Sequence, residues 1–200
     1  MIKDRLYCDG AASLSRRSAQ TAIWRILDAV TRLLAPILSF TADEIWLAMP
    51  HSAEADGRNV CLNDMPASDP AWALSEEEES RWASILRVRA DVNKALELAR
   101  AEKRIGKPLD ARVTLRCSDK VPASVRTLDT EELERICIVS EVVTVSGEGE
   151  GVPGENVEGL TVFVEASTLP RCERCWTHDA TVGENNNHPT LCARCAAAVG

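Results

Sequence analysis

Two pairs of cysteines near the C-terminus constrain this 200-residue chain more than any other feature. Cys172 and Cys175 form one C-x2-C pair, and Cys192 and Cys195 form a second pair after 16 intervening residues. A tight turn of this kind places two thiolates side by side, and two such turns supply the four tetrahedral ligands of a structural zinc ion. Four cysteines leave no position for water. We therefore predict one structural Zn²⁺ ion, whose binding supplies the folding energy of this small segment.

Other uses of these cysteines explain the spacing less well. A thioredoxin-like redox site needs a single C-x-x-C near a βαβ pattern rather than two matched pairs. His178 and His188 lie between the pairs and remain alternative metal ligands. With no secretory signal at the N-terminus, paired thiols favour a reducing cytoplasm and a metal over disulfides. We expect the scattered cysteines to be structural or free thiols: Cys8, Cys61, Cys117 and Cys137.

The first 74 residues predict helices followed by a loop. Apolar residues at three- and four-residue intervals predict a helix over 18–35, which Pro36 should end. A second short helix should follow, because Thr41 and Glu44 have the spacing of a capping box. Prolines, a glycine and an asparagine interrupt 51–74 without clear periodicity, so we predict a loop there.

A long helix should begin at Ser75, because Ser75 and Glu78 form another capping box. Gly106 and Pro108 should mark its end. Its apolar residues trace one stripe: Trp82, Ile85, Val88, Val92, Leu96 and Ala99. Such a stripe needs a partner, and we expect residues 18–49 to supply it in an antiparallel helical bundle.

The pattern changes after Pro108. Residues 111–117 and 160–165 alternate like strands, residues 130–135 suggest a short helix, and residues 136–145 form a β-rich run. Five glycines and four glutamates make residues 146–159 a turn-rich linker.

The predicted fold is mainly α: an antiparallel helical bundle, then a small α/β unit, then a C-terminal four-cysteine zinc ribbon or knuckle. The corresponding domains are 1–108, 109–168 and 169–200. No apolar run approaches the ~20 residues that a membrane helix requires, so we predict no membrane association.

Sequence motifs along nearly the whole chain resemble the C-terminal part of bacterial isoleucyl-tRNA synthetases, which are class I enzymes. The cysteine pairs in RCERCW (171–176) and LCARC (191–195) are similar to the zinc module of that family. Further motifs resemble its anticodon-binding region and occur in family order: KDRLYC (3–8), RRSAQT (16–21), APILSFTADEIW (35–46), VNK (92–94) with Glu97, and AEKRIG (101–106).

The resemblance implies an enzyme that activates isoleucine with ATP and ligates it to isoleucine tRNA. The HIGH-type and KMSKS-type ATP motifs and the editing domain of that family have no counterpart here. We therefore interpret the chain as a C-terminal segment, with Met1 as a boundary of this sequence, and expect it to be inactive alone. Its expected role is to bind the anticodon stem-loop, and ATP belongs to the missing catalytic domain.

The charge distribution suits an RNA partner better than the net charge of −8 suggests. Residues 81–116 hold ten basic and four acidic residues, a net charge of +6, and residues 1–30 have a net charge of +2. The acidic excess lies elsewhere, with −9 over residues 43–80 and −5 over residues 146–165. Basic side chains on the long helix would supply phosphate contacts and a salt-dependent affinity.

Reading an anticodon needs planar side chains that stack on splayed bases. In the zinc module, Arg174, Trp176 and Arg194 are the candidates by residue type, although Trp176 also suits covering the zinc sulfurs and the arginines also suit offsetting the thiolate charge. The candidate phosphate contacts, each of which also suits a solvated surface, are Arg16, Arg17, Lys94, Arg100, Lys103 and Arg104.

Two other classes of function remain open. The cysteine spacing also resembles the zinc finger of formamidopyrimidine-type DNA glycosylases, but their N-terminal proline and following glutamate are replaced here by Ile2 and Lys3. A stand-alone zinc ribbon that binds nucleic acid or a protein partner is the second alternative. A valyl, leucyl or methionyl synthetase relative would fit the helices alone. We predict a monomeric, cytoplasmic protein that binds isoleucine tRNA and no DNA.

Overall fold

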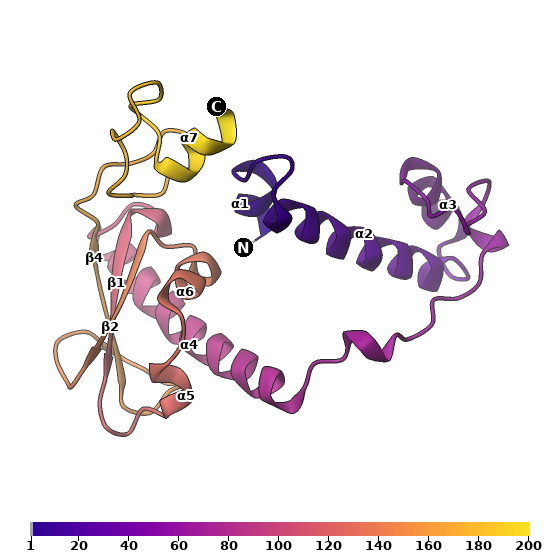
Figure 1. Ribbon diagram of the computed structural model, residues 1–200. Coiled ribbons are helices and arrows are strands. Elements are labelled where there is room, and N and C mark those ends of the chain that lie inside the picture. Colours follow the sequence, from indigo (N-terminus) through magenta and orange to yellow (C-terminus); the bar gives the residue numbers. More distant parts are fainter. Residues whose placement is uncertain (1) are drawn as a thin grey trace. The chain divides into compact units, whose positions relative to one another are not determined.

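The computed structural model of the protein describes residues 2–200, which divide into two compact units (Figure 1). We call Ala11–Ala73 the helical unit, and Met1–Gly10 with Leu74–Gly200 the sheet unit. The α-helices are α1 (Ile2–Tyr7), α2 (Leu14–Leu34), α3 (Ser39–Ala48), α4 (Glu76–Ala101), α5 (Ala123–Arg126), α6 (Thr130–Cys137) and α7 (Ala193–Val199). The strands are β1 (Ala111–Cys117), β2 (Glu141–Ser146), β3 (Val152–Pro153) and β4 (Leu160–Ala166). Among the described residues, no helix has both the length and the apolarity needed to cross a membrane.

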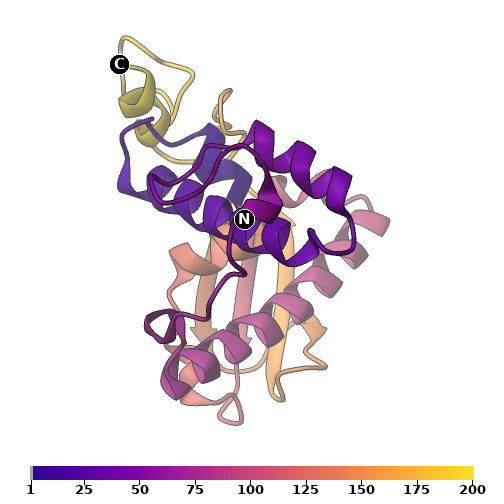
Figure 2. The ribbon, with the colours of Figure 1, turned by 90° about the vertical axis from the view of Figure 1, so that its right-hand side faces the viewer.

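The sheet unit is built on a four-stranded mixed sheet in the order β2-β1-β4-β3. β1 runs parallel to β2 and antiparallel to β4, so that Val113 lies between Val142 and Val164. Helices α4 and α6 pack against one face of this sheet (Figures 1 and 2). Alternate residues of β1 are buried, which is the period-two pattern that predicted this strand from the sequence.

The other predictions for the C-terminal half are confirmed in outline. The predicted strand at 160–165 is β4, and the predicted helix at 130–135 is α6, which continues to Cys137. Within the β-rich run at 136–145, a strand forms only from Glu141, because the chain first leaves α6 through Ile138 in a left-handed conformation with φ of 60°.

The apolar stripe of α4 is buried inside the sheet unit. Ile85, Val88, Val92 and Ala99 are at most 1% exposed and share one core cluster with residues of β1, β2 and β4. The prediction that residues 18–49 cover this stripe is therefore wrong. A sheet face offers more apolar area than one helix, so packing α4 on the sheet removes more apolar surface from water. The architecture combines helices with a mixed sheet, and "mainly α" understates its strand content.

The start of α4 is the predicted capping box. The Ser75 hydroxyl accepts a hydrogen bond from the Glu78 N–H at 3.3 Å, and the Glu78 carboxylate accepts one from the Ser75 N–H at 2.9 Å. These two bonds satisfy N–H groups that have no partner inside the helix.

The end of α4 comes earlier than Gly106 predicted. The helix stops at Ala101 because Lys103 takes a left-handed conformation, with φ of 58°. The N–H of Lys103 then bonds the carbonyl of Arg100, and the N–H of the next residue bonds that of Ala99, which is the Schellman pattern. Glycine is the usual residue at this position, so the sequence carries no clear signal for the helix end.

A buried carboxylate joins α4 to the loop before β4. Asp91 is 2% exposed and accepts the backbone N–H groups of Glu155, Asn156 and Val157 at 2.9–3.0 Å. The Asn156 side-chain amide donates to it as well, at 2.7 Å. A Cβ atom on Gly154 would lie 2.7 Å from Asp91 Oδ2, so this close approach requires glycine. Residues 155–157 of the predicted 146–159 linker are thus held in place by hydrogen bonds to the buried Asp91 side chain.

In the helical unit, α2 begins at Leu14, four residues before the predicted start. Ser13 is its N-cap, with the hydroxyl accepting from the Arg16 N–H at 3.2 Å. The helix ends at Leu34, before Pro36, as predicted.

The predicted second helix exists as α3, but its start is different. It begins at Ser39 after Leu38, which provides no side-chain cap, so the predicted capping box at Thr41 and Glu44 is wrong. The chain turns directly out of α2, since the Leu38 N–H bonds the carbonyl of Leu34 at 2.8 Å, and helical geometry resumes before Thr41 is reached.

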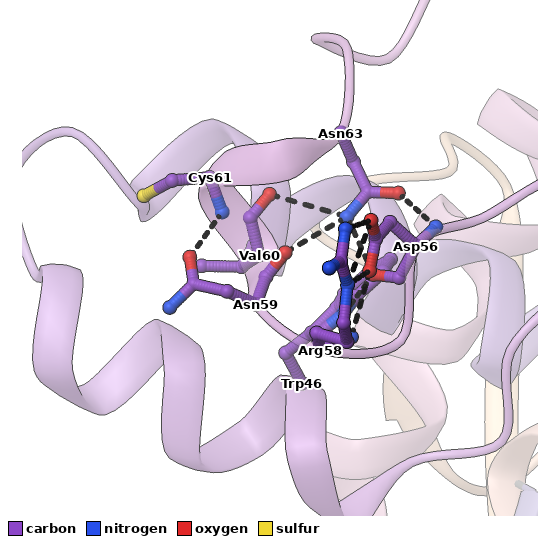
Figure 3. A network of polar contacts seen from close by, with 7 residues as sticks. All are labelled: Trp46, Asp56, Arg58, Asn59, Val60, Cys61 and Asn63. Carbon is purple, nitrogen blue, oxygen red and sulfur yellow. Dashed lines mark hydrogen bonds and ion pairs between the residues drawn. The ribbon is translucent and has the colours of Figure 1, made fainter.

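The loop predicted for 51–74 contains two short 3₁₀ turns and is ordered by one amide side chain. Asn63 Nδ2 donates to the carbonyls of Asp56 and Asn59 at 3.0 and 3.1 Å, and its Oδ1 accepts from the Asp56 N–H at 2.8 Å (Figure 3). The indole N–H of Trp46 also donates to the Asp56 carbonyl, at 3.0 Å, which ties the loop to α3.

Most large apolar side chains of α2 are exposed to solvent. The buried residues of α2 are Ala19, Asp28 and Thr31. Trp24 packs on the core of the helical unit, but the other large apolar side chains of α2 are at least 37% exposed: Leu14, Ile23, Ile26, Leu27, Val30, Leu33 and Leu34. The core of the helical unit is correspondingly small, consisting of Ala35, Ala42, Trp46, Met49 and Val60.

The compact units divide the chain at residues 10 and 73. The domains predicted from the sequence, 1–108, 109–168 and 169–200, follow changes in sequence pattern and stay a prediction.

Candidate metal centre and RNA-binding surface

Four cysteine side chains converge in the sheet unit. The Sγ atoms of Cys172, Cys175, Cys192 and Cys195 lie within 4.8 Å of one another, and all four residues are buried. The Cys175 and Cys192 sulfurs are 3.9 Å apart, close to the ~3.8 Å edge of a tetrahedron with Zn–S bonds of ~2.3 Å. Within residues 2–200, no other group of three or more potential ligand residues is gathered around one point. The four cysteines are positioned to bind one metal ion.

The two cysteine pairs form different local structures. After Cys175 the chain turns through Trp176, which has a left-handed φ of 67° and donates its N–H to the Cys172 carbonyl at 2.9 Å. In the second pair, Cys192 is the N-cap of α7 and Cys195 lies in the first helical turn. The N–H of Cys192 points at the Cys172 sulfur, 3.4 Å away. Such N–H groups favour a thiolate.

Burial and hydrogen bonding act in opposite directions on these thiols. Burial raises the pKa of Cys172, but backbone N–H groups of Cys175, Cys192 and Arg174 outweigh it and lower the pKa to about 6. Burial dominates at Cys195 and raises its pKa to about 11, and it raises the pKa of Cys192 as well. Buried thiols of this kind become thiolates together when they ligate a cation, so the donor set fits zinc.

The histidines between the cysteine pairs do not join the cluster. His178 Nδ1 donates to the Leu169 carbonyl at 2.7 Å, and its Nε2 lies 3.7 Å from an Asp110 carboxylate oxygen. The group gathered around one point consists of cysteines alone, so the alternative in which His178 or His188 replaces a cysteine ligand is not favoured.

Two of the candidate phosphate contacts form ion pairs on the α4 surface. Lys94 pairs with Glu155, and Arg100 lies 3.4 Å from Glu97 one turn earlier in the helix. All four side chains are more than 40% exposed, so these pairs contribute little stability, ~0–1 kcal/mol each.

The next two candidates differ in their surroundings. Lys103 is exposed at the left-handed turn that ends α4. Arg104 is engaged: its Nη1 donates to the Val164 carbonyl of β4 at 2.6 Å, and its Nε pairs with Glu102 at 2.7 Å. Arg104 thus links the end of α4 to the sheet.

In the zinc module, the predicted base-reading residues are arranged unequally. Trp176 is 53% exposed, and Lys107 Nζ lies 5.2 Å from its ring centroid. Arg174 and Arg194 instead reach residues 4–9 of the same unit. In the helical unit, Arg16 and Arg17 lie in the first turn of α2.

Comparison with known proteins identifies the family. A family described as the anticodon-binding domain of tRNA ligase matches residues 1–115, which is more than half of the chain. The chain belongs to this anticodon-binding family. A second family, the zinc finger found in FPG and IleRS, matches residues 170–198 and includes all four cysteines. The zinc finger is shared with FPG by its description, so the anticodon-binding match is what disfavours the glycosylase alternative.

Relatives of this anticodon-binding chain include isoleucine–tRNA ligases of three bacteria. Identity is 46% to the ligase of Syntrophotalea carbinolica, 43% to that of Geobacter sulfurreducens and 41% to that of Desulfitobacterium hafniense. The alignments cover 98–100% of this chain but only 21–22% of each relative. The chain therefore spans about a fifth of the length of these ligases.

Sequence reasoning missed the role of residues 4–9 in the metal centre of this anticodon-binding protein. Cys8 is buried against the four zinc-site cysteines. Burial, followed by the charge of Asp4, raises the pKa of its thiol to about 11, so it packs there as a neutral group. The available signal was an arginine directly before the second cysteine of each pair, with Asp4 and Asp9 near the N-terminus.

Proposed function

We propose that this chain is the C-terminal, tRNA-binding segment of an isoleucyl-tRNA synthetase and that it recognises the anticodon stem-loop of isoleucine tRNA. The observation that carries the proposal is the alignment of 98–100% of the chain with isoleucine–tRNA ligases, together with the anticodon-binding match. Ligation of isoleucine to tRNA with ATP belongs to the whole enzyme. We expect the chain alone to be inactive, since its motifs include no ATP site.

The exposed stripe of α2 supports a place in a larger helical assembly. An amphipathic helix is stable when its apolar face is covered, and contiguous apolar patches of this kind mark interfaces. We propose that helices of the remaining enzyme cover this stripe.

Phosphate contacts are proposed for basic side chains at the start of α2 and along α4. Arg16 and Arg17 lie at the N-terminal end of α2, where the helix dipole favours an anion such as phosphate. Lys103 is exposed at the end of α4. Lys94 and Arg100 can exchange their weak surface pairs for phosphates at small cost.

Base recognition is proposed for the zinc module. Trp176 presents an exposed ring beside the metal centre, and base–aromatic stacking contributes ~1–3 kcal/mol per base. Lys107 above the ring adds positive charge where a phosphate would pass. Arg174 and Arg194 already donate hydrogen bonds to residues 4–9. We therefore propose that they contact tRNA through their remaining N–H groups. We also propose that the protein is monomeric and cytoplasmic and that it does not bind DNA.

Binding to the isolated anticodon stem-loop tests this function. The isoleucine stem-loop is compared with the same stem carrying a methionine anticodon. Trp176→Ala should weaken binding to the isoleucine stem-loop about tenfold or more, and Trp176→Phe should restore most of it. Trp72→Ala is the matched control, because Trp72 is also exposed, 57%, and also lies beneath a cation, Arg25. Equal losses for Trp72→Ala and Trp176→Ala, or equal binding of both anticodons, would contradict the proposal.

A further inference from the structure

Each zinc knuckle carries an arginine directly before its second cysteine, and both arginines reach the same short segment. Arg174 donates to the carbonyls of Tyr7 and Cys8, the first of these at 3.0 Å. Arg194 donates to both carboxylate oxygens of Asp4, at 2.6 and 2.9 Å. Arginines at equivalent places in two knuckles thus converge on residues separated from them by more than 160 positions in sequence.

The segment that they hold has little stability of its own. Helix α1 has six residues and buries none of them, and an isolated helix of this length is not stable in water. The carbonyls of Tyr7 and Cys8 lie at its C-terminal end, where carbonyls lack partners within the helix. Arg174 supplies those partners, and its positive charge is favourable at this end of the helix dipole.

The same segment covers the metal centre. Cys8 is 8% exposed and packs on the four zinc-site cysteines. Arg194 also lies 3.6 Å from Asp9, and Arg174 Nη1 lies 3.5 Å from the sulfur of Cys195. Each arginine therefore links residues 4–9 to a turn whose shape depends on cysteine ligation.

We propose that the zinc module is a metal-dependent clasp for residues 4–9, in which Arg174 and Arg194 are positioning residues. Ligation of the four cysteines fixes the two knuckles and thereby aims both guanidinium groups at α1. The clasp requires ligation of the four cysteines, and it does not require the proposed binding of tRNA.

Hydrogen–deuterium exchange on the zinc-loaded 200-residue chain tests the clasp, with zinc content measured on the same samples. The informative amide is that of Cys8, which bonds the Asp4 carbonyl at 2.8 Å. Arg194→Ala and Asp4→Asn should each retain one zinc and accelerate exchange of this amide about tenfold. Removing zinc from the wild-type chain should accelerate it at least as much. Arg171→Ala is the matched control, because Arg171 is an exposed arginine beside the first knuckle, and its exchange should equal that of wild type.

Two results would overturn the clasp. The first is that zinc removal makes the amides of the two knuckles exchange freely but leaves the exchange rate of residues 5–9 unchanged. The other is wild-type exchange at Cys8 in zinc-loaded Asp4→Asn, a variant that lies outside the knuckles and so separates the contact from metal retention. Neither measurement contains RNA, so failure of the clasp and failure of the proposed tRNA binding are distinguishable.

Discussion

Removing the Asp91 carboxylate should destabilise the sheet unit far more than removing any surface ion pair. Asp91 accepts three backbone N–H groups and one amide N–H from residues 155–157. In Asp91→Ala those N–H groups lose their acceptor, and each buried donor without a partner costs ~1–3 kcal/mol. Because the loop can partly open to water, we expect a total loss of ~3–5 kcal/mol. Asp91→Asn keeps an accepting oxygen but turns an NH₂ group towards the loop, so its loss should be ~2–3 kcal/mol.

The assay is hydrogen exchange of amides in β1 and β4 in the regime that reports the free energy of opening. A loss of ~3 kcal/mol corresponds to exchange accelerated more than about a hundredfold. Glu155→Gln is the control: it removes the exposed pair with Lys94, which should cost less than ~1 kcal/mol. If Asp91→Ala exchanged within about fivefold of wild type, the loop at 155–157 would not depend on the buried carboxylate.

Three further predictions concern the metal, the RNA and pH. Cys192→Ser should abolish stoichiometric zinc binding, measured by metal analysis, and unfold residues 170–198, measured by circular dichroism. One retained zinc ion with a folded module would exclude a four-thiolate site. Lys103→Ala should reduce the slope of log affinity against log salt for isoleucine tRNA by ~0.7–0.9, and an unchanged slope would leave Lys103 without a phosphate contact. Burial raises the pKa of the Cys137 thiol to about 11 from 9.0, so the folded state favours the neutral thiol. Its contribution to stability should be complete below pH 9 and lost as the pH rises towards 11. Urea titrations of Cys137→Ala should show a smaller decline over that range, and an equal decline would contradict the assignment.

Local signals in the sequence predicted local structure well. The start of α4 follows from Ser75 and Glu78, which act within one turn, and the stop of α2 follows from Pro36. The end of α4 was overestimated because Lys103 occupies a left-handed position without the glycine that usually announces it. The cluster of four cysteines was predictable because zinc ligation needs a fixed spacing of thiols within each turn.

Tertiary pairing was much less predictable. A helical stripe shows only that a partner exists, and the stripe of α4 fits a sheet face as well as a helix. Asp91 looks like an ordinary helix surface residue until the loop at 155–157 folds against it. Arg174 and Arg194 were expected to contact RNA because their guanidinium groups are planar. Their contacts with residues 4–9 arise instead from a fold that brings residues far apart in the sequence together.

Competition binding to the zinc-loaded and the zinc-free chain tests anticodon recognition. Isoleucine tRNA, methionine tRNA and duplex DNA are compared at one fixed salt concentration, because phosphate contacts alone bind all three. We expect the zinc-loaded chain to prefer isoleucine tRNA clearly and to lose that preference when zinc is removed. Equal, weak binding to all three nucleic acids, with or without zinc, would contradict anticodon recognition by this chain.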